Sequence, residues 1–448
     1  MLGLLLCGTS VKEISECLSE NREYTDIVEI DAKVITKENR EEFISFASSV
    51  KIPKVLRLTG TEEMESLQQL LEACRFDFVS SSNHHLCTRL SKTLKKTSVI
   101  RISPSEKMQN LYKTLKKASE NSCIPAVNMC FDSEETLVSY FSFLNNISAF
   151  GKKIIYFSGD YCTPAAILYR KADSMYLCCE KPENLRILKT VYRADRINSE
   201  TTVYATVGNP ANDALSQIMN SAFPKVGMNS VFIPFMTNTL KAFFRISDIL
   251  DISGFSITKP FNREIIPYLG KISREVTQTG AANLAVRENR YLKGMNTDYY
   301  GILNLLEKEL DSGKIKNAVV FGCGVAGHSA VWALRYRHVN VTILNRTADK
   351  ARKLAAQTMS EWDSLENASK YTGKADLIIQ ATSSVEDYAP DFKFTGKELV
   401  CDLVYNANSS AFMSGAEKAG CRIISGKSCL ISQGKLQFEK LTGFYYPE

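Results

Sequence analysis

The segment Ala318-Val319-Val320-Phe321-Gly322-Cys323-Gly324-Val325-Ala326-Gly327 decides the fold of the C-terminal part of the chain. Its first four residues are typical of a buried strand, and an apolar helix is predicted soon afterwards at Ala330–Arg337. The Gly-x-Gly-x-x-Gly pattern allows a tight turn and lets the backbone approach a diphosphate, which the free N–H groups of a helix N-terminus bind. Because a second strand follows at Val341–Leu344, the segment favours a dinucleotide site over the alternative, a structural glycine-rich turn.

The ends of the following strands indicate which dinucleotide binds. An NAD site usually carries Asp or Glu at the end of the second strand, where this chain has Asn345-Arg346-Thr347. Arg346 can pair with a 2′-phosphate, which favours NADP(H) over the alternative of an exposed arginine without a role. A later strand, Asp376–Gln380, leads into a loop expected beside the nicotinamide. We therefore predict a Rossmann-type domain with the cofactor-binding residues Gly322, Gly324, Val325, Ala326, Gly327, Asn345, Arg346, Thr347, Ala381 and Thr382.

The first 200 residues show a regular alternation of short β-rich runs and helical sequence. Most of the gaps between the runs have amphipathic helical patterns, as at Glu62–Cys74 and Ser105–Glu120. Eight strands with intervening helices favour a (β/α)₈ barrel, and a doubly wound sheet is the alternative. The predicted strands are Leu2–Cys7, Ile27–Asp31, Lys54–Leu58, Asp77–Ser80, Ser98–Ile102, Ile124–Met129, Lys153–Ser158 and Met175–Cys179.

Composition restricts the classes of function. The 448 residues are 44% hydrophobic and 23% charged, which is ordinary for a globular protein of two to four domains. The net charge of +6 is dispersed, with no Lys/Arg run longer than a pair, so a nucleic-acid partner is not expected. The sequence contains no run of about 20 apolar residues, so a membrane-spanning helix is not expected. The 13 cysteines are scattered without a C-x-x-C pair, so we expect reduced thiols, no metal site and a cytoplasmic location.

A series of motifs in the C-terminal half has the order and spacing of one enzyme family. Residues 201–446 resemble shikimate dehydrogenase, which implies a substrate lobe at 201–299 plus 426–448 and an NADP-binding Rossmann domain at 300–425. The resemblance also implies a small cyclic hydroxy acid as substrate. It is compatible with assembly of the chain into a homo-oligomer. The matching motifs, besides the phosphate loop, are Gly208-Asn209-Pro210, Gly254–Phe261, Gly280–Asn283, Gly294–Asp298, Asn345–Thr347, Ala381–Ser383, Asp402–Asn406 and Gln433…Gln437-Phe438.

The resemblance assigns roles to individual residues of the substrate lobe. Asp298 matches the Asp that, with a Lys, flanks the reacting oxygen of the substrate in this family. Asn283 and Thr258 match residues that bind the substrate, and Gln433 matches a glutamine that closes the pocket. The alternatives are a turn residue for Asn283 and a strand hydroxyl for Thr258.

Two features of the substrate lobe depart from the family pattern. Asn262 stands where the family has its catalytic Lys, and an amide cannot transfer a proton at neutral pH. Lys259 is close in sequence, but side chains alternate along a strand, so it should point away from Thr258. The family's Ser-x-Ser loop, which holds the substrate carboxylate, is altered here: Ser216 can supply one hydroxyl, while Asp213 would repel an anion. Shikimate itself is therefore in question as the substrate.

The barrel resembles a type I 3-dehydroquinate dehydratase, more weakly, and the whole chain resembles the bifunctional dehydratase–shikimate dehydrogenase fusion. That resemblance implies a Schiff-base Lys on the sixth strand, where this chain has Ala126. The fifth strand lacks the family's His, and Asp31 replaces an Arg two residues after the matching Glu29. Without an amine no Schiff base forms, so dehydratase activity is not expected.

Three functions are consistent with these observations. The first is an NADP-dependent oxidoreductase of the shikimate dehydrogenase type, in chorismate and aromatic amino-acid biosynthesis, with Asp298 and Asn262 at the catalytic positions and a barrel that does not dehydrate. The second is a catalytically impaired NADP(H)-binding pseudoenzyme. The third is a working bifunctional enzyme in which His85 replaces a missing barrel group.

Overall fold

The computed structural model of the protein describes residues 2–59, 64–93, 97–102, 115–116, 120, 123–130, 135, 138–139, 154–158, 176–179, 182–209, 213–382, 392–403 and 411–447. These residues form two compact units, described separately below. One unit consists of Met1–Val203 and Gly227–Asp251, and the other of Tyr204–Val226 and Ile252–Glu448. The three domain ranges given above remain predictions.

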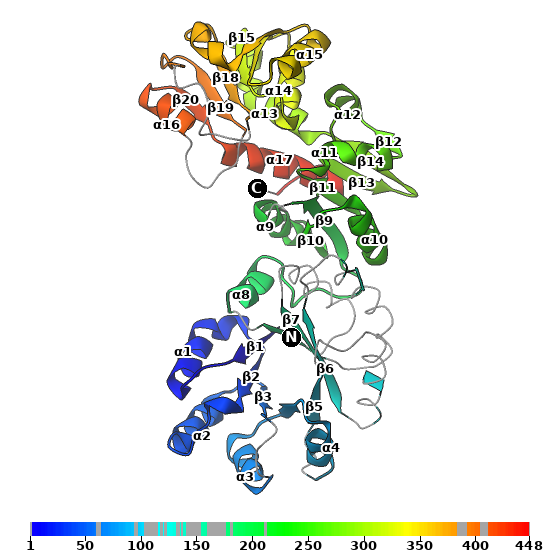
Figure 1. The fold of residues 1–448 in the computed structure, drawn as a ribbon, viewed down its shortest axis with the longest axis vertical. Coiled ribbons are helices and arrows are strands. Elements are labelled where there is room, and N and C mark those ends of the chain that lie inside the picture. The colour runs from blue at the N-terminus through cyan, green and yellow to red at the C-terminus, as the bar shows by residue number, and fades with distance from the viewer. Residues whose placement is uncertain are drawn as a thin grey trace. The chain divides into compact units, whose positions relative to one another are not determined.

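The first unit contains a closed barrel of eight parallel strands in chain order (Figure 1). Strand β1 pairs with β2 on one side and with β8 on the other, which excludes the open, doubly wound alternative. The apolar side chains of Leu5, Val55 and Val99 form part of a buried cluster shared by the strands. The strands are β1 (Leu2–Leu6), β2 (Ile27–Asp31), β3 (Lys54–Arg57), β4 (Phe78–Ser81), β5 (Thr97–Ile102), β6 (Ile124–Cys130), β7 (Ile154–Ser158) and β8 (Tyr176–Cys179).

Helix α1 shows how the sequence builds the outer layer of the barrel. Ser10 caps its N-terminus by accepting a hydrogen bond from the Glu13 N–H, and Val11, Ile14 and Leu18 bury one face at helical spacing. Most of the helix predicted at Ser105–Glu120 lies outside the described residues. The helices of this part are α1 (Val11–Asn21), α2 (Arg40–Ser49), α3 (Met64–Cys74), α4 (His84–Thr93) and α8 (Pro182–Thr190).

A second, mixed sheet has six strands in the order β10-β9-β11-β13-β14-β12. Strand β11 pairs in parallel with β9 and antiparallel with β13, so the ends of β9 and β11 lie side by side. Its strands are β9 (Thr202–Gly208), β10 (Ser230–Met236), β11 (Gly254–Ile257), β12 (Lys271–Ile272), β13 (Leu284–Glu288) and β14 (Tyr291–Met295). The helices around it are α9 (Asp213–Ala222), α10 (Leu240–Leu250), α11 (Phe261–Glu264) and α12 (Arg274–Thr279).

The third sheet is wholly parallel, with the order β17-β16-β15-β18-β19-β20. The chain order reverses between β15 and β18, and in open α/β sheets ligands bind beyond the carboxyl ends of the strands at such a point. The strands are β15 (Asn317–Phe321), β16 (Asn340–Asn345), β17 (Glu361–Ser364), β18 (Leu377–Gln380), β19 (Leu399–Asp402) and β20 (Arg422–Ile424). The helices are α13 (Thr297–Asp311), α14 (Val325–Tyr336), α15 (Ala348–Thr358), α16 (Ala411–Lys418) and α17 (Gly426–Thr442).

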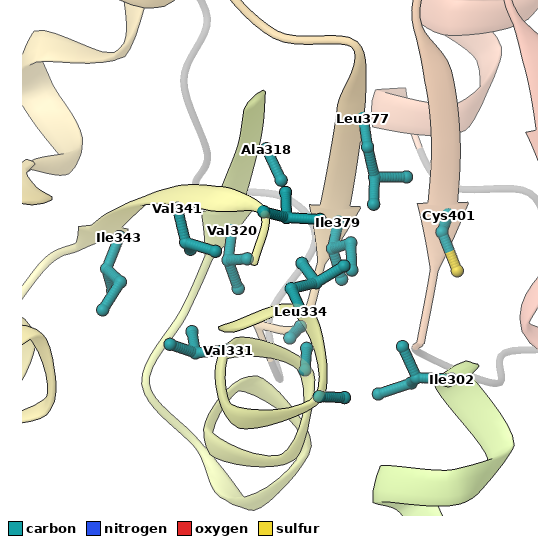
Figure 2. Packing of buried hydrophobic residues seen from close by; sticks show 14 of the residues in the cluster. Ile302, Ala318, Val320, Val331, Leu334, Val341, Ile343, Leu377, Ile379 and Cys401 are labelled. Carbon is teal, nitrogen blue, oxygen red and sulfur yellow. The ribbon is translucent and has the colours of Figure 1, made fainter. Parts of the chain in front are cut away.

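The core of this sheet is apolar on both faces. Figure 2 shows Val331 and Leu334 of α14 packed below Val320 and Ile379 of the central strands, with Ile302 of α13 beside them. A separate cluster containing aromatic side chains covers the opposite face. This packing fixes the start of α14 at the end of β15, where the phosphate loop lies.

Helix α17 contacts β19 of the Rossmann sheet as well as β11 and β13 of the mixed sheet. It therefore links the cofactor-binding lobe to the substrate lobe within one compact unit. Among the described residues, nine cysteines are free thiols and six of these are buried. No helix in the described ranges is long and apolar enough to span a bilayer.

Candidate active site

The phosphate loop leaves β15 at Gly322 and enters α14 at Val325. Gly322 has a φ of +104°, and a Cβ there would lie 2.9 Å from the Ala381 carbonyl oxygen. A Cβ on Gly327 would overlap the carbonyl oxygen of Gly322, so helix and loop approach this closely only without side chains. The N-cap residue of α14, Gly324, makes no side-chain capping bond, which leaves the first N–H groups of the helix available to an anion.

The residues after β16 support this loop. The side-chain oxygen of Asn345 accepts a hydrogen bond from the Cys323 N–H at 3.2 Å, and its amide nitrogen donates to the Thr347 carbonyl at 2.9 Å. Asn345 therefore joins the phosphate loop to the Asn345-Arg346-Thr347 turn. The side chain of Arg346 is exposed at the same turn.

A cavity of about 760 Å³ lies over the loop and is strongly cationic. Nine of the ten predicted cofactor residues line it, and the tenth, Gly327, lies beneath the loop. Among the described residues that line it there is no Asp or Glu. The sequence reasoning missed eight of them: Lys259, Arg263, Cys323, His328, Lys350, Lys353, Leu354 and Gln357.

A signal for some of these missed residues was present in the sequence. Lys350, Lys353, Leu354 and Gln357 follow one another at helical spacing along a single face of α15, directly after the Arg346 turn. The cations of the described lining and the glycine cradle together fit a ligand that carries several phosphates.

The substrate lobe holds a carboxylate in a network of amides. Asn283 Oδ1 accepts from the Thr297 N–H at 2.7 Å, and since a backbone N–H can only donate, the amide nitrogen of Asn283 must face the other way. That nitrogen donates to Asp298 Oδ1 at 2.5 Å, and Gln433 Nε2 donates to the same oxygen. Within the described residues, Asp298 Oδ2 has no hydrogen-bond partner.

Burial raises the pKa of Asp298 to about 6, and the hydrogen bonds from Asn283 and Gln433 oppose that shift. Part of the Asp298 residue surface remains exposed, but the carboxyl group itself is enclosed by protein. A carboxyl with this pKa exchanges a proton readily near neutral pH.

Gln437, one turn after Gln433 on α17, extends the network and was not predicted as a site residue. Its Nε2 donates to Thr297 Oγ1 at 3.1 Å, and Thr297 Oγ1 donates to Asn283 Oδ1 at 3.0 Å. The Oε1 atom of Gln437 is buried without a partner among the described residues. The i, i+4 spacing of two glutamines on an apolar helix was the sequence signal for this residue.

Asn262 is buried and its side chain is engaged with the backbone. Its Nδ2 donates to the carbonyls of Ile257 at 2.7 Å and Ala282 at 3.3 Å, and the Ala282 N–H donates back to the Asn262 carbonyl at 2.8 Å. Asn262 therefore joins the end of β11 to the segment before Asn283. This arrangement braces the site, and the amide supplies no transferable proton.

The remaining predicted substrate residues lie in the same lobe. The Thr258 hydroxyl, at the end of β11, donates to the Val207 carbonyl at 3.3 Å. Ser216 is fully buried in α9, and its hydroxyl has no partner among the described residues. Residues 211–212 and the side chain of Asp213, which carried the prediction of anion repulsion, lie outside the described residues. In the described ranges, no group of three or more His, Cys, Asp or Glu side chains could hold a metal ion.

Comparison with known proteins agrees with this architecture. The model of the shikimate dehydrogenase substrate binding domain matches residues 206–285, and that of shikimate/quinate 5-dehydrogenase matches residues 304–391. The shikimate dehydrogenase (NADP(+)) of Pyrococcus furiosus is 33% identical over 255 residues, which cover 55% of this chain and 92% of that protein. The Moorella thermoacetica enzyme of the same name is 33% identical over 268 residues, covering 55% and 90%.

Solved structures show the same relationship. Shikimate dehydrogenase from Aquifex aeolicus superposes with a TM-score of 0.52 at 28% identity and covers 56% of this chain and 96% of that one. A shikimate dehydrogenase in complex with NADP⁺ gives a TM-score of 0.51 at 30% identity and covers 56% and 93%. Through its C-terminal half, the chain belongs to the shikimate dehydrogenase family.

Proposed function

We propose that the C-terminal half is an NADP(H)-dependent oxidoreductase that interconverts a hydroxyl and a ketone on a small cyclic hydroxy acid. Shikimate and 3-dehydroshikimate, in chorismate and aromatic amino-acid biosynthesis, are the first pair to test. The observation that carries the proposal is the Asp298 carboxyl, whose Oδ1 is held by Asn283 and Gln433 and whose Oδ2 has no partner in the described part of the chain. Relatives named shikimate dehydrogenase (NADP(+)) support the choice of cofactor.

The chain's own residues supply positioning and proton transfer. When bound, NADP(H) accepts or donates the hydride. Asp298 removes the proton of the reacting hydroxyl during oxidation and returns it during reduction, for which a pKa of about 6 is suitable. The amides of Asn283 and Gln433 keep the carboxylate in one orientation, so that Oδ2 faces the substrate.

The glycine cradle and the cationic cavity fit NADP(H). Residues Gly322–Gly327 and the start of α14 would hold the diphosphate, and Arg346 with Lys350 would hold the 2′-phosphate.

The proposal is tested with purified protein, NADP⁺ and either shikimate or quinate, by following the absorbance of the reduced cofactor. Turnover that disappears in Asp298→Asn supports it. If neither acid is oxidised while calorimetry detects micromolar binding of NADP⁺, the oxidoreductase proposal is rejected.

The second candidate function, an NADP(H)-binding pseudoenzyme, is favoured by Asn262. The amide at this position is buried and donates to two backbone carbonyls, so Asn262 itself supplies no second proton-transfer group beside the Asp298 network. The outcome just described, binding without turnover, is the result expected for this candidate.

For the barrel we propose no dehydratase activity. Ala126 of β6 lies with Leu5, Val55 and Val99 in a buried apolar cluster, so a methyl group occupies the position of the family's amine. Incubation with 3-dehydroquinate and borohydride should leave the mass of the protein unchanged. A covalent adduct found by mass spectrometry would show that another amine forms the Schiff base.

A further inference from the structure

The cofactor cavity receives cations from two different lobes. Arg346, Lys350 and Lys353 follow β16 in the Rossmann lobe, whereas Lys259 and Arg263 come from the loop and short helix after β11 in the substrate lobe. All five line the same cavity, and the part of its lining that the structure describes contains no acid. One lobe therefore supplies part of the positive charge of a pocket whose glycine loop belongs to the other lobe.

The backbone that carries Lys259 and Arg263 is firmly anchored. The Lys259 carbonyl accepts from the Asn209 N–H at 2.9 Å, and the Phe261 side chain is buried. Between the two cations, Asn262 is held by its bonds to Ile257 and Ala282. The backbone is thus fixed on both sides, while the two cationic side chains themselves are exposed to the cavity.

The charge of Arg263 reaches the phosphate loop. His328 lies in the first turn of α14, where its Nδ1 is 3.1 Å from the Gly324 carbonyl oxygen. Burial lowers the pKa of His328, and the positive charge of Arg263 lowers it further. Arg263 and the His328 side chain at the start of α14 line the same cavity, whereas Arg346 belongs to the turn after β16.

We infer that Lys259 and Arg263 bind the diphosphate of NADP(H) together with the phosphate loop, so that both lobes hold the cofactor. This inference rests on the proposed function, because it requires NADP(H) to be the ligand. Two separate groups of cations match the two separate anionic groups of NADP(H), its diphosphate and its 2′-phosphate. Lys259 and Arg263 lie before and after Asn262 in the sequence. They bind phosphate, whereas the amide of Asn262 cannot transfer a proton.

The test compares the affinities of three ligands for the full chain by calorimetry. NADP⁺ carries the diphosphate and the 2′-phosphate, NAD⁺ only the diphosphate, and adenosine 2′-monophosphate only the 2′-phosphate. Lys259→Ala and Arg263→Ala are each expected to weaken NADP⁺ and NAD⁺ by about 5- to 30-fold while leaving adenosine 2′-monophosphate unchanged. Arg346→Ala should weaken NADP⁺ and adenosine 2′-monophosphate and spare NAD⁺.

Lys271→Ala and Arg290→Ala are matched controls, because both side chains are exposed on the same lobe and neither lines the cavity. Arg263→Glu should enlarge the loss of NADP⁺ affinity, and added salt should reduce the difference between this variant and wild type. An equal loss of adenosine 2′-monophosphate affinity in the Lys259 and Arg263 variants, or no loss of NADP⁺ affinity, would overturn the inference. If wild type binds NADP⁺ with neither measurable heat nor competition, the proposed function fails together with it.

Discussion

The cofactor cavity and the Asp298 network belong to one compact unit, but they match the pattern that the sequence resemblance implies to different extents. The cavity keeps the glycine loop and gathers cations from two lobes. The network keeps Asp298, Asn283 and Gln433 but has Asn262 where the family pattern has Lys. Phosphate binding is shared by many N–H groups and cations, whereas proton transfer depends on a few positioned groups. A single substitution therefore affects the Asp298 network far more than the cofactor cavity.

Removal of the Asp298 carboxylate should produce the largest effect. Asp298→Asn keeps the shape of the side chain but cannot accept a proton, so kcat for oxidation should fall by about 10²–10⁴-fold. Because Asp298 does not line the cofactor cavity, the Kd for NADP⁺ should stay unchanged. Steady-state kinetics and calorimetry measure the two quantities. The control is Asp311→Asn, an exposed acid at the other end of α13.

The same carboxylate predicts a pH profile. With a pKa of about 6, Asp298 is ionised above that pH, so the rate of hydroxyl oxidation should rise as pH increases through about 6 and then level off. The rate of ketone reduction should show the opposite trend. A profile that is flat from pH 5 to 7 in both directions would contradict the role of Asp298.

A lysine at position 262 is the second test of the comparison between the cofactor cavity and the Asp298 network. Asn262→Lys places an ammonium beside the Asn283 segment, because Asn262 already bonds to the neighbouring Ala282 carbonyl. We expect kcat to rise by about 10²-fold, the lower end of the usual effect of one positioned acid or base. Asn262→Gln is the matched control, since it lengthens the side chain without adding a transferable proton. Equal rates in the two variants would show that charge at this position does not limit turnover.

The sequence predicted the strands of the barrel and of the Rossmann sheet well because buried strands carry strong apolar patterns. The prediction for β2 at Ile27–Asp31 has the observed bounds, β15 begins one residue before the predicted Ala318, and α14 begins five residues before the predicted Ala330. The N-terminus of α14 was difficult to predict because it lies within the phosphate loop. Glycines and small residues are common in loops, and here they also form the first turn of the helix.

The sites were less predictable where distant segments meet. Sequence order places Asp298 and Asn283 close together, but it does not reveal that Gln433 and Gln437 approach them from α17. The structure places Lys259 beyond the end of β11 and in the cofactor cavity, which local sequence could not identify. Such contacts depend on lobe packing, which no local pattern encodes.

Burial of Asp298 should also appear in the pH dependence of stability. Its pKa is about 6 in the folded protein and 3.8 as the ordinary value, so between these values the folded state keeps a proton that the unfolded chain has lost. The free energy of unfolding should therefore fall by about 3 kcal/mol as pH rises from about 4 to about 6. In Asp298→Asn this part of the decrease should be absent.

The measurement is urea unfolding at several pH values, followed by fluorescence. The chain has two tryptophans, Trp332 and Trp362, both in the Rossmann lobe, and α13 packs into the core of that lobe. The unfolding free energy of Asp298→Asn minus that of wild type should become more positive as pH rises from 4 to 7. A constant difference for Asp298→Asn would mean that the carboxyl is not buried in solution.

The smallest expected effect concerns the choice between NADP and NAD. Arg346 is exposed at the turn after β16, so water partly screens its bond to a 2′-phosphate. Arg346→Ala should therefore reduce the ratio of NADP⁺ affinity to NAD⁺ affinity by about 10-fold. Arg352→Ala on the same lobe is the control, because Arg352 pairs with Asp349 and does not line the cavity. If the ratio is unchanged in Arg346→Ala but falls in Lys350→Ala or Lys353→Ala, the cations of α15 and not the turn select the 2′-phosphate. That result would keep the cationic cavity and move its specificity onto the helix face that sequence reasoning missed.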